Sequence, residues 1–333
     1  MKRILYLGYY FKELNWKQFK KFKSLVKQQT GKSELQIWFE MINSSLKYNI
    51  SLLEYFQFHF YKISESQKKE FAGTGYMYEY QLKMNPKESR NVLEDKIIFL
   101  KNYGVFVKHD FASLTEIENG KADIEHLLKN NSGKIVLKNS KGQCGNGIEV
   151  CNVNDLTRDS LQQQLIKAGN DYVEEFVVQH ADLMQLSPSG LNTIRIITQL
   201  DNTNKIHILG ARLRITVKSA VDNLAAGNMA ATIDITNGVV DSPGVYSDIT
   251  KADAYVHPIT GVSIIGFQIP YWKETMAMVK AAALIDTRNK SIGWDVAITD
   301  NGPELIEGNQ DWCKLLWQLP AKKGLKYELE KFI

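Results

Sequence analysis

The sequence predicts an α+β fold with a helical extension at its N-terminus. Residues 12 to about 70 are rich in Lys, Leu, Phe and Tyr and contain no Gly between Lys32 and Ala72, which is typical of helices. Gly and Pro then interrupt the chain in "FAGTGYMYEY" and "KMNPKES", so we expect a boundary near residues 71 to 90. From about residue 91, short β-rich runs alternate with helical patterns, and the 333 residues are enough for two or three subdomains.

The N-terminal 30 residues carry most of the positive charge. They contain eight Lys or Arg and one Glu, while the whole chain has a net charge of +4. In "WKQFKKFKSLVKQQ", Trp16, Phe19, Phe22 and Val26 recur near helical spacing between lysines. This helix either docks on an anionic membrane surface or an acidic partner, or packs its apolar side into a core with the lysines in solvent. The second interpretation is favoured because such stripes are more often core.

The sequence also predicts a cytoplasmic protein. Its three cysteines are odd in number and lack paired-ligand spacing, which argues for a reducing compartment and against a disulfide scaffold or a zinc site. The start, "MKRILYLGYYFKELNW", has no small-residue cleavage site and is far shorter than the ~20 apolar residues of a membrane span. Six scattered histidines form no metal pattern, and no recognition motif accompanies the basic residues, so we expect no nucleic-acid binding.

The elements after residue 90 are predicted from their periodicity and turn signals. "NVLEDKIIFLKNYG" and "ADIEHLLKN" are expected as helices on either side of a short strand, "GVFVKH". Two strands, "GKIVLK" and "GIEVCNV", then flank a Gly-rich loop, followed by the helix "DLTRDSLQQQLIKAG" and the strand "DYVEEFVVQ". Longer strands follow in "LNTIRIITQL", "KIHILGARLRIT" and "MAATIDIT", then the helix "KETMAMVKAAALIDTR" and two apolar runs around "TDNGP".

The Gly-rich loop in "KIVLKNSKGQCGNGIEV" is the first candidate site. Lys138 ends a strand, and Gly142, Gly145 and Gly147 follow. Glycines let backbone N–H groups turn toward an anion, and the lysine supplies a charge. The loop either covers phosphates or is a plain β-hairpin connection, and its composition alone favours the hairpin.

The strand "DYVEEFVV" is the second candidate. Adjacent strand residues face opposite sides, so one of Glu174 and Glu175 points inward. Such a strand could bind a purine through its backbone and a ribose through the carboxylate, or it could be an edge strand with solvated acids.

Arginines on apolar strands form the third candidate. Arg195 lies among isoleucines in "LNTIRI", while Arg212 and Arg214 share one face of "GARLRIT". Arginines in such positions imply an anionic ligand or buried partner acids. The polar loop "VDNLAAGN", which contains Asn228, is expected at the rim.

The fourth candidate is a set of oxygen ligands in "GWDVAITDNGPELIEGNQDW". Asp295, Glu307 and Asn309 offer only hard oxygen ligands, which suit Mg²⁺ and not zinc. Glu307 and Asn309 are two apart on a strand and share a face, and Asp295 approaches that face if the two runs pair through the "TDNGP" turn. Because Mg²⁺ completes its shell with substrate phosphates, the cluster predicts a triphosphate–metal site.

These four features, in this order, resemble the ATP-grasp superfamily over about Asn91 to Trp312. The similarity is best in "LNTIRI", "VDNLAAGN" and "GWDVAITDNGPELIEGNQDW", which look most like the sugar-transfer-associated ATP-grasp group, linked to surface polysaccharide clusters. The resemblance implies an ATP-grasp fold, in which two α+β subdomains grip ATP, here residues 91–178 and 179–333, with residues 1–90 as a helical N-terminal region. That region stands where the family usually has an α/β domain that helps bind the carboxylate substrate.

The resemblance also implies roles for individual residues. Lys96 and Lys138 would contact the α- and β-phosphates, and the loop from Ser140 to Gly147 would close over the triphosphate. Adenine and ribose would lie at Glu174, Glu175, Phe176 and Val177. Asp295, Glu307 and Asn309 would hold Mg²⁺, with Mn²⁺ as a substitute. Arg195 and Arg212 would face the γ-phosphate or an acyl phosphate, and Asn228 would lie on the substrate side.

The implied activity is that of an ATP- and Mg-dependent carboxylate–amine or carboxylate–thiol ligase that acts through an acyl phosphate on a sugar, amino acid or peptide. Two alternatives remain open. One is a kinase that phosphorylates a hydroxyl with the same ATP site, and the other is a non-catalytic ATP-binding module of polysaccharide assembly.

Overall fold

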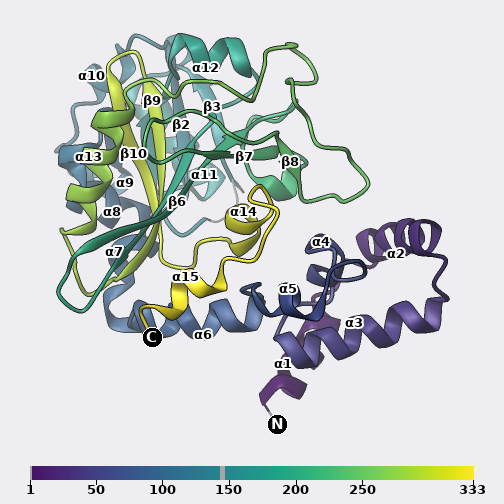
Figure 1. The fold of residues 1–333 in the computed structure, drawn as a ribbon. Coiled ribbons are helices and arrows are strands. Elements are labelled where there is room, and N and C mark those ends of the chain that lie inside the picture. Colours follow the sequence, from purple (N-terminus) through teal and green to yellow (C-terminus); the bar gives the residue numbers. More distant parts are fainter. Residues whose placement is uncertain (1, 143–146) are drawn as a thin grey trace.

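A computed structural model describes residues 2–142 and 147–333 of the chain. It contains a helical N-terminal lobe and two antiparallel β-sheets (Figure 1). Gly145, one of the predicted phosphate-loop glycines, lies outside the described residues.

The N-terminal lobe consists of helices that bury a largely aromatic core. The longer ones are α1 (Lys2–Lys12), α2 (Trp16–Thr30) and α3 (Glu34–Tyr48), followed by the short α4 (Glu54–Gln57) and α5 (Glu65–Lys69). In α2 the side chain of Asn15 caps the first turn, and Gly31 (φ 69°) ends the helix in the left-handed conformation that glycine tolerates. Phe19, Phe22 and Val26 are buried, so the prediction of a core-packed helix is confirmed, while Trp16 at its start is about half exposed.

The first sheet, here sheet A, has the strand order β1-β4-β2-β3. Its strands are β1 (Phe111–Ser113), β2 (Lys134–Lys138), β3 (Glu149–Asn152) and β4 (Tyr172–Glu175). The helices α9 (Leu114–Glu118), α10 (Ile124–Leu128) and α11 (Arg158–Ala168) pack with it around Leu137, Leu161 and Val173. The strands β2 and β3 pair as an antiparallel hairpin, as their flanking position around the Gly-rich loop predicts.

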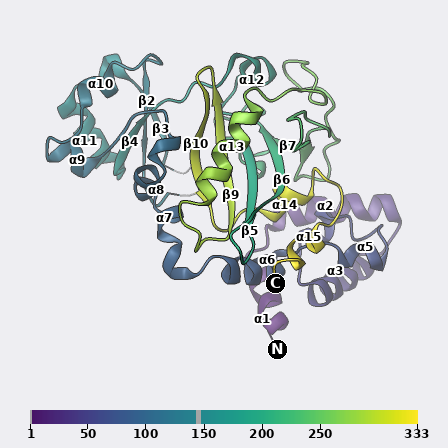
Figure 2. The same ribbon diagram turned by 60° about the vertical axis from the view of Figure 1, so that its left-hand side comes forward.

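The second sheet, sheet B, has the order β10-β9-β5-β6-β7-β8. Its strands are β5 (Ile194–Leu200), β6 (Ile206–Ile215), β7 (Met229–Ile233), β8 (Val245–Tyr246), β9 (Ser291–Thr299) and β10 (Gly302–Asn309). All of β5 is buried, because α13 (Trp272–Ala283) and the helices before sheet A contribute to one core with it. Figure 2 shows sheet A and the N-terminal lobe on opposite sides of sheet B.

Several local predictions were wrong. The segment "GVFVKH" is not a strand: Gly104–Phe106 forms a 3₁₀ turn, and β1 begins only at Phe111. The single helix expected from Asn91 to Gly104 is divided into α7 (Asn91–Glu94) and α8 (Lys96–Asn102), because Asp95 adopts an extended conformation and caps Ile98. The expected break at residues 71 to 90 contains a helix, α6 (Thr74–Met84), and α12 (Ala181–Leu186) was not predicted.

The C-terminal segment packs against the N-terminal lobe. Two short helices, α14 (Lys314–Gln318) and α15 (Lys326–Glu330), follow sheet B. Leu316 and Leu319 join the core of the N-terminal lobe, and Trp317 packs in a separate cluster with Met77 and Tyr80 of α6. The N-terminal helices are therefore packed on the end of the chain and not on sheet A.

Candidate functional site

The predicted pairing of the two runs around "TDNGP" is confirmed, since β9 and β10 are antiparallel neighbours. Glu307 lies directly opposite Asp295, after a register irregularity between Leu305 and Glu307. Such an irregularity re-aims side chains locally. Asn309 donates from Nδ2 to Glu307 Oε1 at 3.1 Å. The strand pair therefore brings together the three residues predicted as metal ligands.

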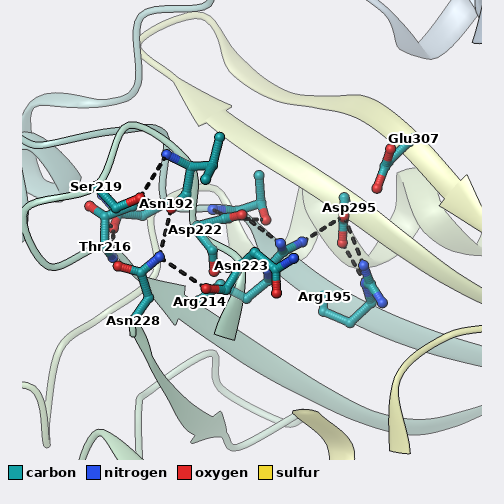
Figure 3. A network of polar contacts seen from close by, with 12 residues as sticks. Asn192, Arg195, Arg214, Thr216, Ser219, Asp222, Asn223, Asn228, Asp295 and Glu307 are labelled. Carbon is teal, nitrogen blue, oxygen red and sulfur yellow. Dashed lines mark hydrogen bonds and ion pairs between the residues drawn. The ribbon is translucent and has the colours of Figure 1, made fainter. Parts of the chain in front are cut away.

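Asp295 on β9 is buried and binds two arginines, one on the adjacent strand β5 and one on β6, the strand beyond it (Figure 3). Arg195 of β5 donates from Nε to Oδ1 and from Nη2 to Oδ2 at 2.9 Å, and Arg214 of β6 donates from Nη1 to Oδ2 at 2.7 Å. Burial opposes ionisation of Asp295, but attraction to Arg195 and Arg214 outweighs it and lowers the pKa of this carboxyl below its ordinary value. Both oxygens of Asp295 thus already accept hydrogen bonds from positive groups.

The carboxyl of Glu307 has the opposite shift. Burial, followed by repulsion from ionised Asp295, raises its pKa above the ordinary value. A divalent cation would neutralise the two adjacent carboxylates, so that both could ionise at neutral pH.

The residues present fit Mg²⁺ as a donor set. Within residues 2–142 and 147–333, no cluster of three or more His, Cys, Asp and Glu side chains could hold a metal on its own. Two acids and one amide instead leave coordination positions open, and Mg²⁺ usually fills these with water and substrate phosphate oxygens.

Arg214 extends the site toward the loop after β6, a role that was not predicted for it. Its Nη2 lies 2.6 Å from Asp222 Oδ1. Asp222 Oδ2 also accepts hydrogen bonds from the backbone N (2.8 Å) and the hydroxyl (2.5 Å) of Thr193. One arginine therefore bridges two acids, Asp222 and Asp295, from different parts of the chain.

Arg212 shares a strand face with Arg214 but has different partners. Its Nε and Nη2 donate to the carbonyl oxygen of Trp317 at 3.0 and 2.5 Å, and Nη1 donates to that of Ala211 at 2.8 Å. Burial lowers the pKa of Arg212 to about 10. The structure therefore places Arg212 under α14 and not beside Asp295. The strand pattern predicts that the two arginines have the same surroundings. Their partners differ because the C-terminal segment passes over Arg212 and its Trp317 accepts the hydrogen bonds of that residue.

Asn228 is buried, with its polar atoms bound to the loop that precedes it. Its Oδ1 accepts from the backbone N of Val217 at 2.7 Å, and its Nδ2 donates to the carbonyl oxygens of Val221 (2.6 Å) and Asn223 (3.0 Å). Asn228 thus fixes the loop that carries Asp222, as Figure 3 shows.

The residues predicted to bind nucleotide lie mainly on sheet A and in α8. Lys138 Nζ and Glu174 Oε1 form an ion pair, and Lys96 Nζ donates to the carbonyl oxygen of Gly142. Glu174 is buried, and the inward-facing acid expected in this strand is therefore Glu174. Glu175 accepts from the backbone N of Asp110 at 2.8 Å.

The other predicted nucleotide contacts are less enclosed. Phe176 donates its backbone N–H to Lys134 at 3.2 Å, and the Lys134 ammonium lies 5.5 Å from its ring centre. Val177, just beyond β4, is partly exposed. Gly147 has φ 74°, a conformation that favours glycine.

Tyr172 lies near residues of both the predicted nucleotide site and the predicted metal site. Burial, followed by the charges of Glu174 and Glu307, raises the pKa of the Tyr172 hydroxyl. Tyr172 on β4 is therefore within electrostatic range of both groups. Glu174 of sheet A and Glu307 of sheet B therefore both lie near Tyr172.

A buried histidine joins the two sheets beside this region. His109 Nδ1 lies 2.7 Å from Glu304 Oε2 on β10, and Nε2 lies 3.8 Å from Glu174 Oε2 on β4. Burial alone would lower the pKa of His109, but Glu304 and Glu174 raise it overall. The sequence gives only a weak indication of the contact between His109 and Glu304, because Glu304 is a single acid within the apolar strand β10.

The two antiparallel sheets, with a lysine–glutamate pair on one and an Asp/Glu/Asn set on the other, define an ATP-grasp protein. The comparison with protein families agrees with this assignment. The chain belongs to the sugar-transfer associated ATP-grasp family, whose model matches residues 76–333.

Similar solved structures include three proteins at 11–14% sequence identity. A biotin carboxylase from Campylobacter jejuni is 11% identical, with a TM-score of 0.45 over 73% of this chain and 46% of that chain. For a D-alanyl-alanine synthetase A from Vibrio cholerae the values are 14%, 0.40, 74% and 62%. For an ADP complex of N5-carboxyaminoimidazole synthetase from Staphylococcus aureus they are 11%, 0.41, 70% and 52%. The chain thus spans about half the length of these proteins, and no curated protein matches it.

The described helices include none that is both long enough and apolar enough to cross a membrane.

Proposed function

We propose that this protein is an ATP- and Mg-dependent ligase that joins a carboxylate to an amine or a thiol through an acyl phosphate. The observation that carries the proposal is the register of β9 and β10, which sets Glu307 opposite Asp295 with Asn309 bonded to Glu307. Arg195 and Arg214 bind Asp295 of this set, and such cations can also stabilise the charge of a triphosphate.

The nucleotide would lie between the two sheets. We propose that Lys96 and Lys138 bind its phosphates, that the loop containing Gly142, Gly145 and Gly147 covers them, and that Glu174 to Val177 hold the adenosine. The Lys138–Glu174 ion pair supports this arrangement, since it leaves a cation and an acid that can turn to a phosphate and a ribose. We also propose residues 91–178 and 179–333 as the two subdomains that enclose ATP.

Asp295, Glu307 and Asn309 would hold Mg²⁺, or Mn²⁺ in its place. The ion would neutralise charge on the β- and γ-phosphates. Since both oxygens of Asp295 bind arginines, Glu307 and Asn309 have the freer donor atoms for a cation. Arg195 and Arg214 would then keep Asp295 ionised and face the developing charge.

In the first step, a carboxylate oxygen of the substrate would attack the γ-phosphorus while the bond to the β,γ-bridging oxygen breaks and ADP leaves. An amine nitrogen or a thiol sulfur would then attack the acyl carbon, lose its proton and displace phosphate. The protein groups orient the reactants and stabilise charge. Arg212 binds Trp317, and Asn228 binds the loop after β6. Both residues would position the elements around the site without contacting the reacting atoms.

The family name associates the chain with sugar transfer. We therefore propose that the acceptor or the carboxylate is a sugar, amino acid or peptide of surface polysaccharide biosynthesis, processed in the cytoplasm. The test is mass spectrometry of products after incubation with ATP, Mg²⁺ and a panel of sugar acids, amino sugars and amino acids. A condensed product with release of ADP and phosphate supports ligation, whereas a phosphorylated hydroxyl with ADP alone contradicts it.

A further inference from the structure

The N-terminal lobe has an outer face formed by α1 and α3. Arg3 on α1 donates from Nη1 to the carbonyl oxygens of Leu46 (2.9 Å) and Lys47 (2.8 Å) at the end of α3. At the other end of α1, the ring of Phe11 stacks on Trp38 of α3, with centroids 6.2 Å apart. The two helices therefore lie side by side and antiparallel.

Large apolar side chains on this pair are exposed to solvent. On α1, Leu5 and Tyr9 are four residues apart on one helix face, Ile4 is adjacent to Leu5, and Leu5 is 71% exposed. On α3, Leu35 and Phe39 lie one turn apart, next to the turn that carries Trp38, and are 81% and 73% exposed. We call these five residues the apolar face. Five large exposed apolar residues on two neighbouring helices are more than the singly scattered ones of an ordinary surface, so the set indicates an interaction surface.

Positive charges outnumber acids around the apolar face, although Glu13, directly after α1, is an exposed acid. Helix α1 contains Lys2, Arg3 and Lys12 and no acid. Lys12, like Lys17 and Lys20 of α2, forms no ion pair among the described residues. Two nearby acids are already neutralised: Glu34 lies 2.6 Å from Lys23, and Glu79 lies 2.9 Å from Lys2.

We propose that the apolar face docks this protein on the surface of an anionic phospholipid bilayer. Lysines beside exposed apolar and aromatic side chains are the composition of helices that lie in the headgroup region. Tyr9, and Trp16 at the start of α2, are 58% and 51% exposed and belong to the residue types enriched at that depth. The longest helices here have 15 residues, so the contact is peripheral.

The geometry keeps the candidate site accessible in the docked state. The lobe and sheet A lie on opposite sides of sheet B in Figure 2, so a membrane at the lobe would not cover sheet A. This proposal does not depend on the ligase activity.

The test is co-sedimentation of the full chain with vesicles of phosphatidylcholine containing 30% phosphatidylglycerol, and with vesicles of phosphatidylcholine alone. We expect binding to the anionic vesicles that weakens at high salt, and little binding to the neutral ones. Leu5→Glu and Phe39→Glu should each weaken binding at least about tenfold, because each inserts a charge into the apolar face. Lys12→Glu should weaken it by about tenfold through charge alone.

Val105→Glu is the matched control, since Val105 is 83% exposed but lies outside the lobe. Circular dichroism establishes that each variant is folded. No binding by the wild type, equal binding to neutral vesicles, or equal losses in Val105→Glu and Phe39→Glu would overturn the proposal. Self-association that disappears in Phe39→Glu, without vesicle binding, would overturn it in favour of a second copy as the partner.

Discussion

At the scale of single residues, the site depends on how two arginines of one strand differ. Arg214 bridges Asp222 and Asp295, while Arg212, two residues earlier, binds the carbonyl oxygen of Trp317. Arg212 is buried and Arg214 is largely so, yet only Arg214 forms ion pairs with acids among the described residues. Their substitutions should therefore have different consequences.

Arg214→Lys keeps the charge but cannot bridge two acids with separate nitrogens. We expect its turnover of ATP to fall by about 100-fold, because the donors that face developing charge are lost. Arg212→Lys should lower the free energy of unfolding by about 1–3 kcal/mol, through the lost bonds to Trp317, and leave kcat of the folded fraction near the wild-type value. Steady-state kinetics with urea unfolding measure both, and equal losses of kcat would show that the two arginines are not distinct.

At the scale of elements, a buried glutamate in the first turn of α4 anchors the N-terminal lobe to the end of the chain. Glu54 accepts from the backbone N of Ser51 (2.7 Å) and of Thr74 (3.0 Å), and Lys314 Nζ of α14 lies 3.2 Å from its Oε1. Glu54 is 1% exposed.

Glu54→Gln should lower the free energy of unfolding by about 3–5 kcal/mol, because it leaves the Lys314 ammonium without its acid. The control is Glu65→Gln in α5, whose solvent-screened ion pairs with Lys47 and Lys68 should contribute little to stability. Denaturant unfolding compares the two. If Glu54→Gln were no more destabilised than Glu65→Gln, the anchoring role would be wrong.

The same lobe should lose stability in mild acid. Burial, followed by Lys62, lowers the pKa of His59 to about 4 from an ordinary value of 6.5. The unfolded chain then binds more protons than the folded one between these values, so stability falls as pH decreases from about 6.5 to about 4, by up to about 3 kcal/mol. His59→Asn should flatten this dependence.

Asn is the suitable replacement because His59 has φ 55°, a conformation that Asn tolerates better than most residues. Urea unfolding of wild type and variant at pH 7, 5.5 and 4.5 measures the effect. Parallel curves for the two proteins across this range would contradict it.

At the scale of the whole molecule, two kinds of sequence information gave correct predictions: the alternation of apolar residues along a strand and the order of the motifs along the chain. The alternating apolar runs around "TDNGP" predicted the β9–β10 pair and hence the approach of Glu307 to Asp295. The order of the four motifs predicted the family, which the match over residues 76–333 confirms.

What could not be predicted depends on contacts between distant segments. The carbonyl oxygen of Trp317 accepts a hydrogen bond from Arg212, and Glu304 on β10 pairs with His109, which precedes sheet A. Neither partner is marked by spacing in the sequence. Short elements such as β1 and α12 were missed for a related reason, since three to six residues carry too little periodicity.

The central claim is that β9 and β10 form the metal side of an ATP site. Calorimetric titration of the protein with ATP, with and without Mg²⁺, tests it most directly, using Glu307→Gln and, as a control, Glu125→Gln on the surface of α10. The account predicts Mg-dependent ATP binding by the wild type and by Glu125→Gln, weakened at least about tenfold in Glu307→Gln. An affinity for ATP that does not depend on Mg²⁺, or that is the same in Glu307→Gln as in the wild type, would contradict it.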